Sequence, residues 1–193
     1  MFVNIFIIGI EVIKMTYKCV FSDIDGTLVN GDQPISSKDQ EAIKKLREKG
    51  HYFSFCTGRN IQETKIITPY FEYDYLVLNN GAMIVDQQDQ VLYRKQIKNE
   101  IAKEILNESM KKYPYLNYTF FDGKQTYGFI NEKTCKLTNE GYQEIEGNFL
   151  DILNNTTEDI DIVCAFHPEE KLDEIVTKYD FLTAHRGMGL MQG

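Results

Sequence analysis

The chain has 193 residues, 42% of them hydrophobic, and a formal net charge of -8 at pH 7. This apolar content is ordinary for a globular protein and is sufficient for the core of one or two domains. The acidic balance excludes a general nucleic-acid or anionic-membrane binder, because either would need a concentrated basic surface. We therefore expect no nucleic-acid partner.

Residues 1–16 are interpreted as an N-terminal extension. Their apolar run is interrupted by Asn4 and Glu11 and is too short to span a bilayer, so we expect no stable membrane insertion. Whether residues 1–14 belong to the native product stays open, as does the alternative that they associate with a membrane surface. No secretory signal is recognised, and the cysteines show no metal-binding spacing, which favours the reducing cytoplasm.

Residues 17–96 alternate strand and helix patterns, which predicts an α/β domain with a parallel sheet. The predicted strands cover residues 17–22, 51–56 and 73–78. One helix is expected between Ser36, a candidate N-cap, and Gly50, and a second from about residue 61 to 67. A turn and hairpin are expected over residues 79–97.

Residues 97–185 follow a different pattern and are predicted to form a second α/β domain of about four strands and two helices. The first helix should cover residues 97–113, because apolar residues recur there at helical spacing and Pro114 ends the run. The other expected elements are a short helix at 142–153 interrupted by Gly147, a helix at 167–179 and strands at 116–121, 126–130, 159–166 and 181–185. Residues 186–193 are interpreted as a return segment toward the first domain.

Small, polar or acidic residues follow three successive predicted strands at the point where each strand ends. Asp23 and Asp25 follow the first strand. Thr57, Gly58 and Arg59 follow the second strand, and Asn79, Asn80 and Gly81 follow the third. Open α/β sheets bind ligands outside the carboxyl ends of their strands, so these residues predict a site at one edge of the sheet. Two acids this close raise the cost of ionising at least one of them, unless a cation or a reaction uses the pair.

Three sequence strings carry a resemblance to a known family. DIDGTL, FCTGR and LNNGAMI resemble motifs of the haloacid dehalogenase superfamily of phosphohydrolases, in particular its Cof-type sugar-phosphate phosphatases. The resemblance covers about residues 17–192. It implies a Rossmann-like core over residues 17–96 and an α/β cap over residues 97–185.

The resemblance implies a phosphatase of small phosphorylated metabolites that works through an aspartyl-phosphate. Asp23 would be the nucleophile, and Asp25 would protonate the leaving oxygen and then activate water. Mg²⁺ is the implied cofactor, held by Asp23 and Asp25.

The resemblance also implies a phosphate-binding set around the two acids. Thr57 would donate a hydrogen bond to the phosphoryl oxygens, and backbone N–H groups around Gly26, Thr27 and Gly58 would complete an anion cradle. Asn80 belongs to the expected phosphate site or is a turn residue only. Arg59 is expected to be structural or to lie at the entrance of the site.

Two motifs of the family are not found in the sequence. The family's lysine and its GDxxND-like acidic turn should follow the cap, whereas the sequence after His185 reads RGMGLMQG. The resemblance therefore predicts a chain truncated before these motifs and impaired in activity. The strand at 17–22 would lie at an exposed sheet edge, which we expect to pair with a second copy or to be covered by residues 2–13.

Three functions remain open on the sequence alone. The first is the phosphatase, and the second is a non-catalytic remnant that binds a phosphorylated ligand or a partner chain. The third is a phosphomutase of the same fold. The sequence determines neither the substrate nor the oligomeric state, because specificity depends on the shape of the cap.

Overall fold

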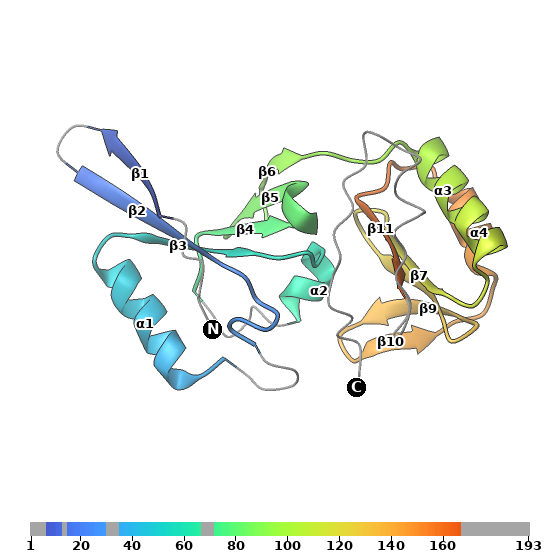
Figure 1. The fold of residues 1–193 in the computed structure, drawn as a ribbon, viewed down its shortest axis with the longest axis horizontal. Helices are drawn as coiled ribbons and strands as arrows, with labels where there is room; N and C mark the ends of the chain where they lie inside the picture. The colour runs from blue at the N-terminus through green and yellow to red at the C-terminus, as the bar shows by residue number, and fades with distance from the viewer. Residues whose placement is uncertain (1–6, 13–14, 30–34, 67–71, 167–193) are drawn as a thin grey trace. The chain divides into compact units, whose positions relative to one another are not determined.

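The computed structural model describes residues 7–12, 15–29, 35–66 and 72–166 (Figure 1). Contacts within the chain divide it into two units, Met1–Arg94 and Lys95–Gly193. This division falls close to the domain boundary expected between residues 96 and 97. Among the described helices, none is long and apolar enough to cross a membrane.

The first unit is built on a six-stranded sheet with the order β1-β2-β3-β4-β5-β6 (Figure 1). Its strands are β1 (Ile7–Val12), β2 (Met15–Ser22), β3 (Tyr52–Cys56), β4 (Tyr75–Leu78), β5 (Met83–Asp86) and β6 (Val91–Arg94). The central strands β2, β3 and β4 are parallel, as predicted. Each outer strand runs antiparallel to its inner neighbour, so the sheet as a whole is mixed.

Helix α1 (Ser37–Glu48) connects β2 to β3, and the short helix α2 (Ile61–Lys65) follows β3. Each helix begins at a polar N-cap, because the first N–H groups of a helix have no partner within it. Ser36 accepts a hydrogen bond from the Asp39 N–H at 3.1 Å. Asn60 and Glu63 form a reciprocal capping box at the start of α2. Both predicted helices are therefore confirmed.

Strand β1 covers the edge of β2 within the same chain. It pairs antiparallel with β2, and Ile8 lies opposite Cys19. The expectation that residues 2–13 would cover this edge is confirmed for residues 7–12. Pairing of that edge with a second copy is not what the structure shows, because the adjacent segment of the same chain already takes the position.

The second unit contains a five-stranded sheet with the order β10-β9-β8-β7-β11. Its strands are β7 (Asn117–Phe121), β8 (Thr126–Ile130), β9 (Lys133–Thr138), β10 (Gly141–Glu144) and β11 (Ile162–Phe166). All neighbouring strands are antiparallel. Helices α3 (Asn99–Lys112) and α4 (Phe149–Asn155) complete the described part of this unit.

Each unit has its own hydrophobic core. In the first unit, buried side chains from the sheet and α1 pack together, among them Phe53, Phe55, Leu76 and Ile43. In the second unit, Tyr118 and Phe120 of β7 are fully buried against α3 and α4. The aromatic residues of the 115–129 region are therefore mostly core residues, with the exception of Tyr115, which is 50% exposed.

Two predictions for the second unit are wrong. The described residues contain five strands rather than about four, and the helix expected at 142–153 is strand β10 followed by α4. The helix begins only after Gly147, whose φ of 117° is outside the helical range. The turn between β8 and β9 consists of Asn131 and Glu132, both with positive φ, a pairing without the usual glycine.

Several predictions fall on residues outside the described ranges. These are the helix at 167–179, the strand at 181–185 and the return segment at 186–193. They stay predictions.

Candidate active site

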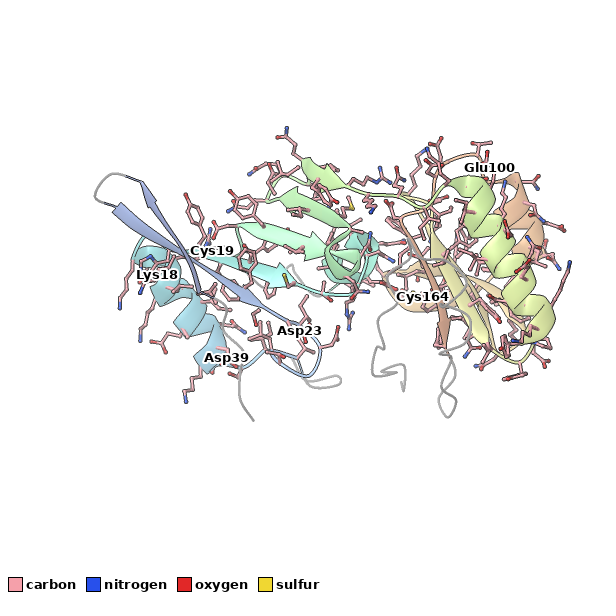
Figure 2. All side chains as sticks on the ribbon, turned by 45° about the horizontal axis from the view of Figure 1, so that its top comes forward. Lys18, Cys19, Asp23, Asp39, Glu100 and Cys164 are labelled. Carbon is pink, nitrogen blue, oxygen red and sulfur yellow. The ribbon has the colours of Figure 1, made fainter. Side chains whose placement is uncertain are left out.

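The loop after β2 places Asp23 at the carboxyl end of the strand (Figure 2). The next residue, Ile24, is only 1% exposed and fastens the loop to the core of the first unit. Its carbonyl accepts hydrogen bonds from the N–H groups of Leu28 at 3.0 Å and Val29 at 2.9 Å. The loop is therefore a tight turn in which the buried Ile24 lies between the two predicted acids, Asp23 and Asp25.

Gly26 allows this turn, because its φ of 75° lies in the left-handed region that other residues rarely adopt. Its N–H donates to the Val29 carbonyl at 2.7 Å. This N–H was expected to bind phosphate, and in the structure it closes the turn instead. A phosphate group could use it only if the turn opened.

Asp23 is exposed and lies near the end of the next strand. Its Oδ2 accepts a hydrogen bond from the Thr27 hydroxyl at 3.3 Å. Burial raises the pKa of the Cys56 thiol at the end of β3, and the Asp23 carboxylate raises that pKa further. The predicted nucleophile thus lies close to the end of the second parallel strand, adjacent in sequence to Thr57.

Thr57 follows β3, and its backbone is hydrogen-bonded to residues at the end of β4. Its N–H donates to the Val77 carbonyl at 2.9 Å, and its carbonyl accepts from the Asn80 N–H at 3.2 Å. Its hydroxyl oxygen accepts from the Arg59 N–H at 3.2 Å. The side chain is 6% exposed and the hydroxyl hydrogen is still available to donate, which suits the predicted contact with a phosphoryl oxygen.

Gly58 is exposed and lies against the Asn80 side chain. A Cβ atom added at Gly58 would be 3.0 Å from the Asn80 Oδ1, closer than ordinary packing allows. Glycine at this position therefore permits the close approach of the two loops. Asn80 itself has a φ of 54° and is exposed, so it is both a turn residue and accessible at the site.

Asp25 and Arg59 form a bidentate ion pair that joins the loops after β2 and β3. The Arg59 Nη2 donates to Asp25 Oδ1 at 2.7 Å, and the Nε donates to Oδ2 at 2.9 Å. Hydrogen bonding to Asp25 raises the pKa of Arg59, against the lowering effect of burial. Sequence reasoning had not linked Arg59 to either acid, although it is the only basic residue in the three strings.

Asn79 was expected at the end of the third strand, but no role was assigned to it from the sequence. Its side chain is 5% exposed, and neither side-chain amide atom has a hydrogen-bond partner among the residues that the structure describes. Its φ of 51° and the hydrogen bond from its N–H to the Arg59 carbonyl, at 3.0 Å, hold it beside the site loops. Leaving a polar group buried and unpaired costs about 1–3 kcal/mol. The only sequence signal was the Asn-Asn pair that precedes Gly81.

The donor atoms of this loop partly fit the implied Mg²⁺. The ion prefers oxygen ligands, which the Asp23 carboxylate and the Asp25 carbonyl supply. Both carboxylate oxygens of Asp25, however, are engaged by Arg59. Within the described ranges, no three or more His, Cys, Asp or Glu side chains are grouped so that they could hold a metal ion. The chemistry of the donors is suitable, but few of them are present.

The chain matches the model of the haloacid dehalogenase-like hydrolase family over residues 20–186. This match covers most of the sequence, so the chain belongs to that family. The family and the α/β fold class expected from the three strings are therefore confirmed.

Named relatives are phosphatases that the chain matches over part of their length. The chain is 33% identical over 86 residues to the HMP-PP phosphatase of Klebsiella pneumoniae, which covers 44% of the chain and 32% of that protein. It is 31% identical over 98 residues to the 5-amino-6-(5-phospho-D-ribitylamino)uracil phosphatase YwtE of Bacillus subtilis, which covers 51% of the chain and 34% of that protein. Each match thus spans about a third of the relative's length.

The fold is similar to that of a hypothetical protein from Geobacillus kaustophilus, with a TM-score of 0.62 and 21% sequence identity. The similarity covers 84% of this chain and 62% of that protein. At this level of identity, it supports the fold alone.

Proposed function

We propose that the chain carries the nucleophile of a Mg²⁺-dependent phosphatase that acts on small phosphorylated metabolites. The observation that carries the proposal is the meeting of three loops at the carboxyl ends of β2, β3 and β4. The first loop places an exposed acid, Asp23, near Cys56 at the end of β3, and the ion pair of Asp25 with Arg59 joins that loop to the one that carries Thr57. The relatives named as phosphatases support the class of substrate.

In this proposal, the Asp23 carboxylate attacks the phosphorus atom of a phosphate monoester and forms an aspartyl-phosphate. Asp25, once protonated and released from the Arg59 fork, would donate its proton to the oxygen that leaves. Asp25 then takes a proton from water, which attacks the same phosphorus and releases inorganic phosphate and free Asp23. Bound Mg²⁺, held by the Asp23 carboxylate and the Asp25 carbonyl, would neutralise negative charge at the phosphoryl group.

The phosphoryl oxygens would be held by the Thr57 hydroxyl and the Gly58 N–H, with Asn80 at the open side, whereas the Thr27 N–H, also expected in this cradle, donates to the Ile24 carbonyl at 3.4 Å. We also propose that turnover by this chain alone is low, because the described residues supply few ligands for Mg²⁺. The free state of all four cysteines is in keeping with the proposed cytoplasmic location.

The proposal is tested by phosphate release from a panel of sugar and alditol phosphates, with Mg²⁺ and with EDTA. We expect slow, Mg²⁺-dependent release that falls to background in Asp23→Asn and is unchanged in Glu146→Gln, an exposed acid of the second unit. Binding of the phosphate compounds without release would favour the non-catalytic remnant. Transfer of phosphate to a second position of the sugar would favour the phosphomutase.

A further inference from the structure

The described helices of the first unit cover only one face of its sheet. Phe53, Leu76 and Val85 belong to the buried core of this unit. Ile43 of α1 and Ile61 of α2 pack in the same core, on the same side of the sheet (Figure 1). Successive residues of a strand point to opposite faces of the sheet. The other face, named here the open face, therefore carries six large side chains from β2 to β6: Phe21, Tyr52, Tyr75, Val77, Ile84 and Tyr93.

The open face is continuous across neighbouring strands. Val77 lies opposite Ile84, and Ile84 lies opposite Tyr93. The ring centroids of Tyr52 and Tyr75 are 6.3 Å apart. Tyr52 is 40% exposed and Tyr93 is 48% exposed, and the other four side chains are partly exposed. Parallel strands are normally buried on both faces, so a contiguous apolar surface over them indicates a contact surface.

The six side chains of the open face are uncharged, although the chain has a formal net charge of -8. Two copies of an acidic chain repel each other, and their approach costs least where neither copy presents a charge. Asp86, opposite Tyr75, is charged, but its Oδ1 accepts the N–H groups of Gln88 and Gln90 at 2.9 Å in the hairpin turn. An anionic membrane would require basic residues in place of these six. The charge pattern therefore favours contact with a second copy.

The open face also combines large and small side chains in a way that suits two-fold symmetry. Ser54 and Cys56 of β3 are small. Phe21 of β2 lies beside Ser54 on one side, and Tyr75 and Val77 of β4 lie beside the two small residues on the other. In a two-fold interface each face meets its own copy, so the large residues of one copy can lie over the small residues of the other.

The area of the open face is sufficient for a weak dimer. A large aromatic side chain can bury about 150–250 Å² in total. Because the six side chains are only partly exposed, two copies would bury roughly 800 Å² through them, and the surrounding rim would bring the sum to about 1,000 Å². This is about the minimum area of a specific interface. The expected dimer is therefore reversible and depends on concentration.

We propose that the open face is the interface of a two-fold symmetric homodimer, in which the sheets of two first units pack face to face. The centres of protein interfaces are enriched in aromatic side chains and depleted of charged ones, as the open face is. The inference does not rest on the proposed phosphatase function, because the dimer forms whether or not the chain hydrolyses phosphate esters.

Sedimentation velocity over a wide range of concentration tests the dimer. We expect a monomer–dimer equilibrium for the wild type and for Tyr115→Arg, which changes an exposed aromatic residue of the second unit. Val77→Lys and Ile84→Lys should each raise the dissociation constant by roughly 100-fold, because two-fold symmetry places each introduced charge in the interface twice. Circular dichroism of each variant checks that its fold is retained.

NMR spectra of the wild type give a second measurement that needs no substitution. The side-chain signals of Tyr75 and Val77 should shift with concentration, whereas those of Phe53 and Phe55, in the core under the helices, should not. A monomer at every concentration, a dimer that both lysine variants retain, or growth into larger assemblies would overturn the inference. A monomer that binds an amphipathic helical peptide through the open face would also overturn it, because the face would then belong to a different partner.

Discussion

The two units use their sheets in different ways. In the first unit, three parallel strands end on the same side of the sheet, and contacts join the loops that follow them: Arg59 pairs with Asp25, and the Asn80 N–H donates to the Thr57 carbonyl. In the second unit, β7, β8, β9 and β10 form an antiparallel meander. Successive turns therefore lie at opposite ends of the strands. Parallel order concentrates side chains from distant segments, and a meander distributes them.

The hydrophobic cores of the two units also differ in the residues that they bury. The second unit buries Tyr118, Phe120 and Phe149 in one aromatic cluster, in which the Phe120 and Phe149 ring centroids are 5.5 Å apart. The first unit buries Phe53 and Phe55, but it also buries the side-chain amide of Asn79, which has no hydrogen-bond partner within the described ranges. The first unit therefore gives up some stability at the strand ends where we propose the site.

The largest expected effect tests whether the cores are independent. Phe120→Ala should destabilise the second unit by about 3–5 kcal/mol, because it removes a fully buried ring and leaves a cavity. Phe55→Ala should do the same in the first unit. Hydrogen exchange read unit by unit should show faster exchange only in the unit that carries the substitution. Equal acceleration in both units would mean that they unfold as one.

A smaller effect is expected from two matched helix caps. Asn60→Ala removes the N-cap of α2, and Asn148→Ala removes the N-cap of α4. The Asn148 side chain accepts hydrogen bonds from two N–H groups of α4. Each substitution should cost about 1 kcal/mol. Only Asn60→Ala should also weaken the binding of inorganic phosphate, because Asn60 follows Arg59 directly. Weaker phosphate binding in Asn148→Ala would contradict the contrast between the units.

The smallest expected effect is on the stability of the second unit at acidic pH. The hydrogen bond from Lys98, followed by that from the Asn99 N–H, lowers the pKa of Asp159. A lowered folded-state pKa stabilises the fold above the ordinary value of about 3.9, and this contribution disappears as the pH falls through the folded-state pKa.

Asp159→Asn should therefore lower the melting temperature of the second unit slightly near pH 6, and the difference should shrink as the pH falls below the ordinary Asp value of about 3.9. Thermal scans of both proteins across this range provide the measurement. A difference that grows as the pH falls would contradict the sign of the expected effect.

Most of the first unit could be predicted from its sequence, because local signals coincide there. Polar N-caps at Ser36 and Asn60, apolar strands and glycine turns indicate the elements, and the order of strand and helix indicates the parallel centre. The second unit was predicted less well, because its hairpin turn at Asn131 and Glu132 lacks glycine. The stretch 142–153 contains both a strand and a helix, which Gly147 separates.

The site shows the same limit. The residues at the three strand ends could be listed from the sequence, but contacts between loops could not. The pair of Arg59 with Asp25 depends on the packing of β2 against β3, which fixes the distance between their loops. The buried amide of Asn79 likewise results from a left-handed turn that the residue types alone did not indicate.

The most direct test of the central claim is to look for a phosphorylated aspartate. The chain would be incubated with a small labelled phosphoryl donor and Mg²⁺, quenched in acid, and mapped by peptide mass spectrometry. The account predicts a hydroxylamine-labile phosphoryl group on Asp23, absent in Asp23→Asn and accumulating in Asp25→Asn, which cannot activate water. Label on another residue, or equal labelling of the wild type and Asp23→Asn, would contradict the assignment of the nucleophile to the end of β2.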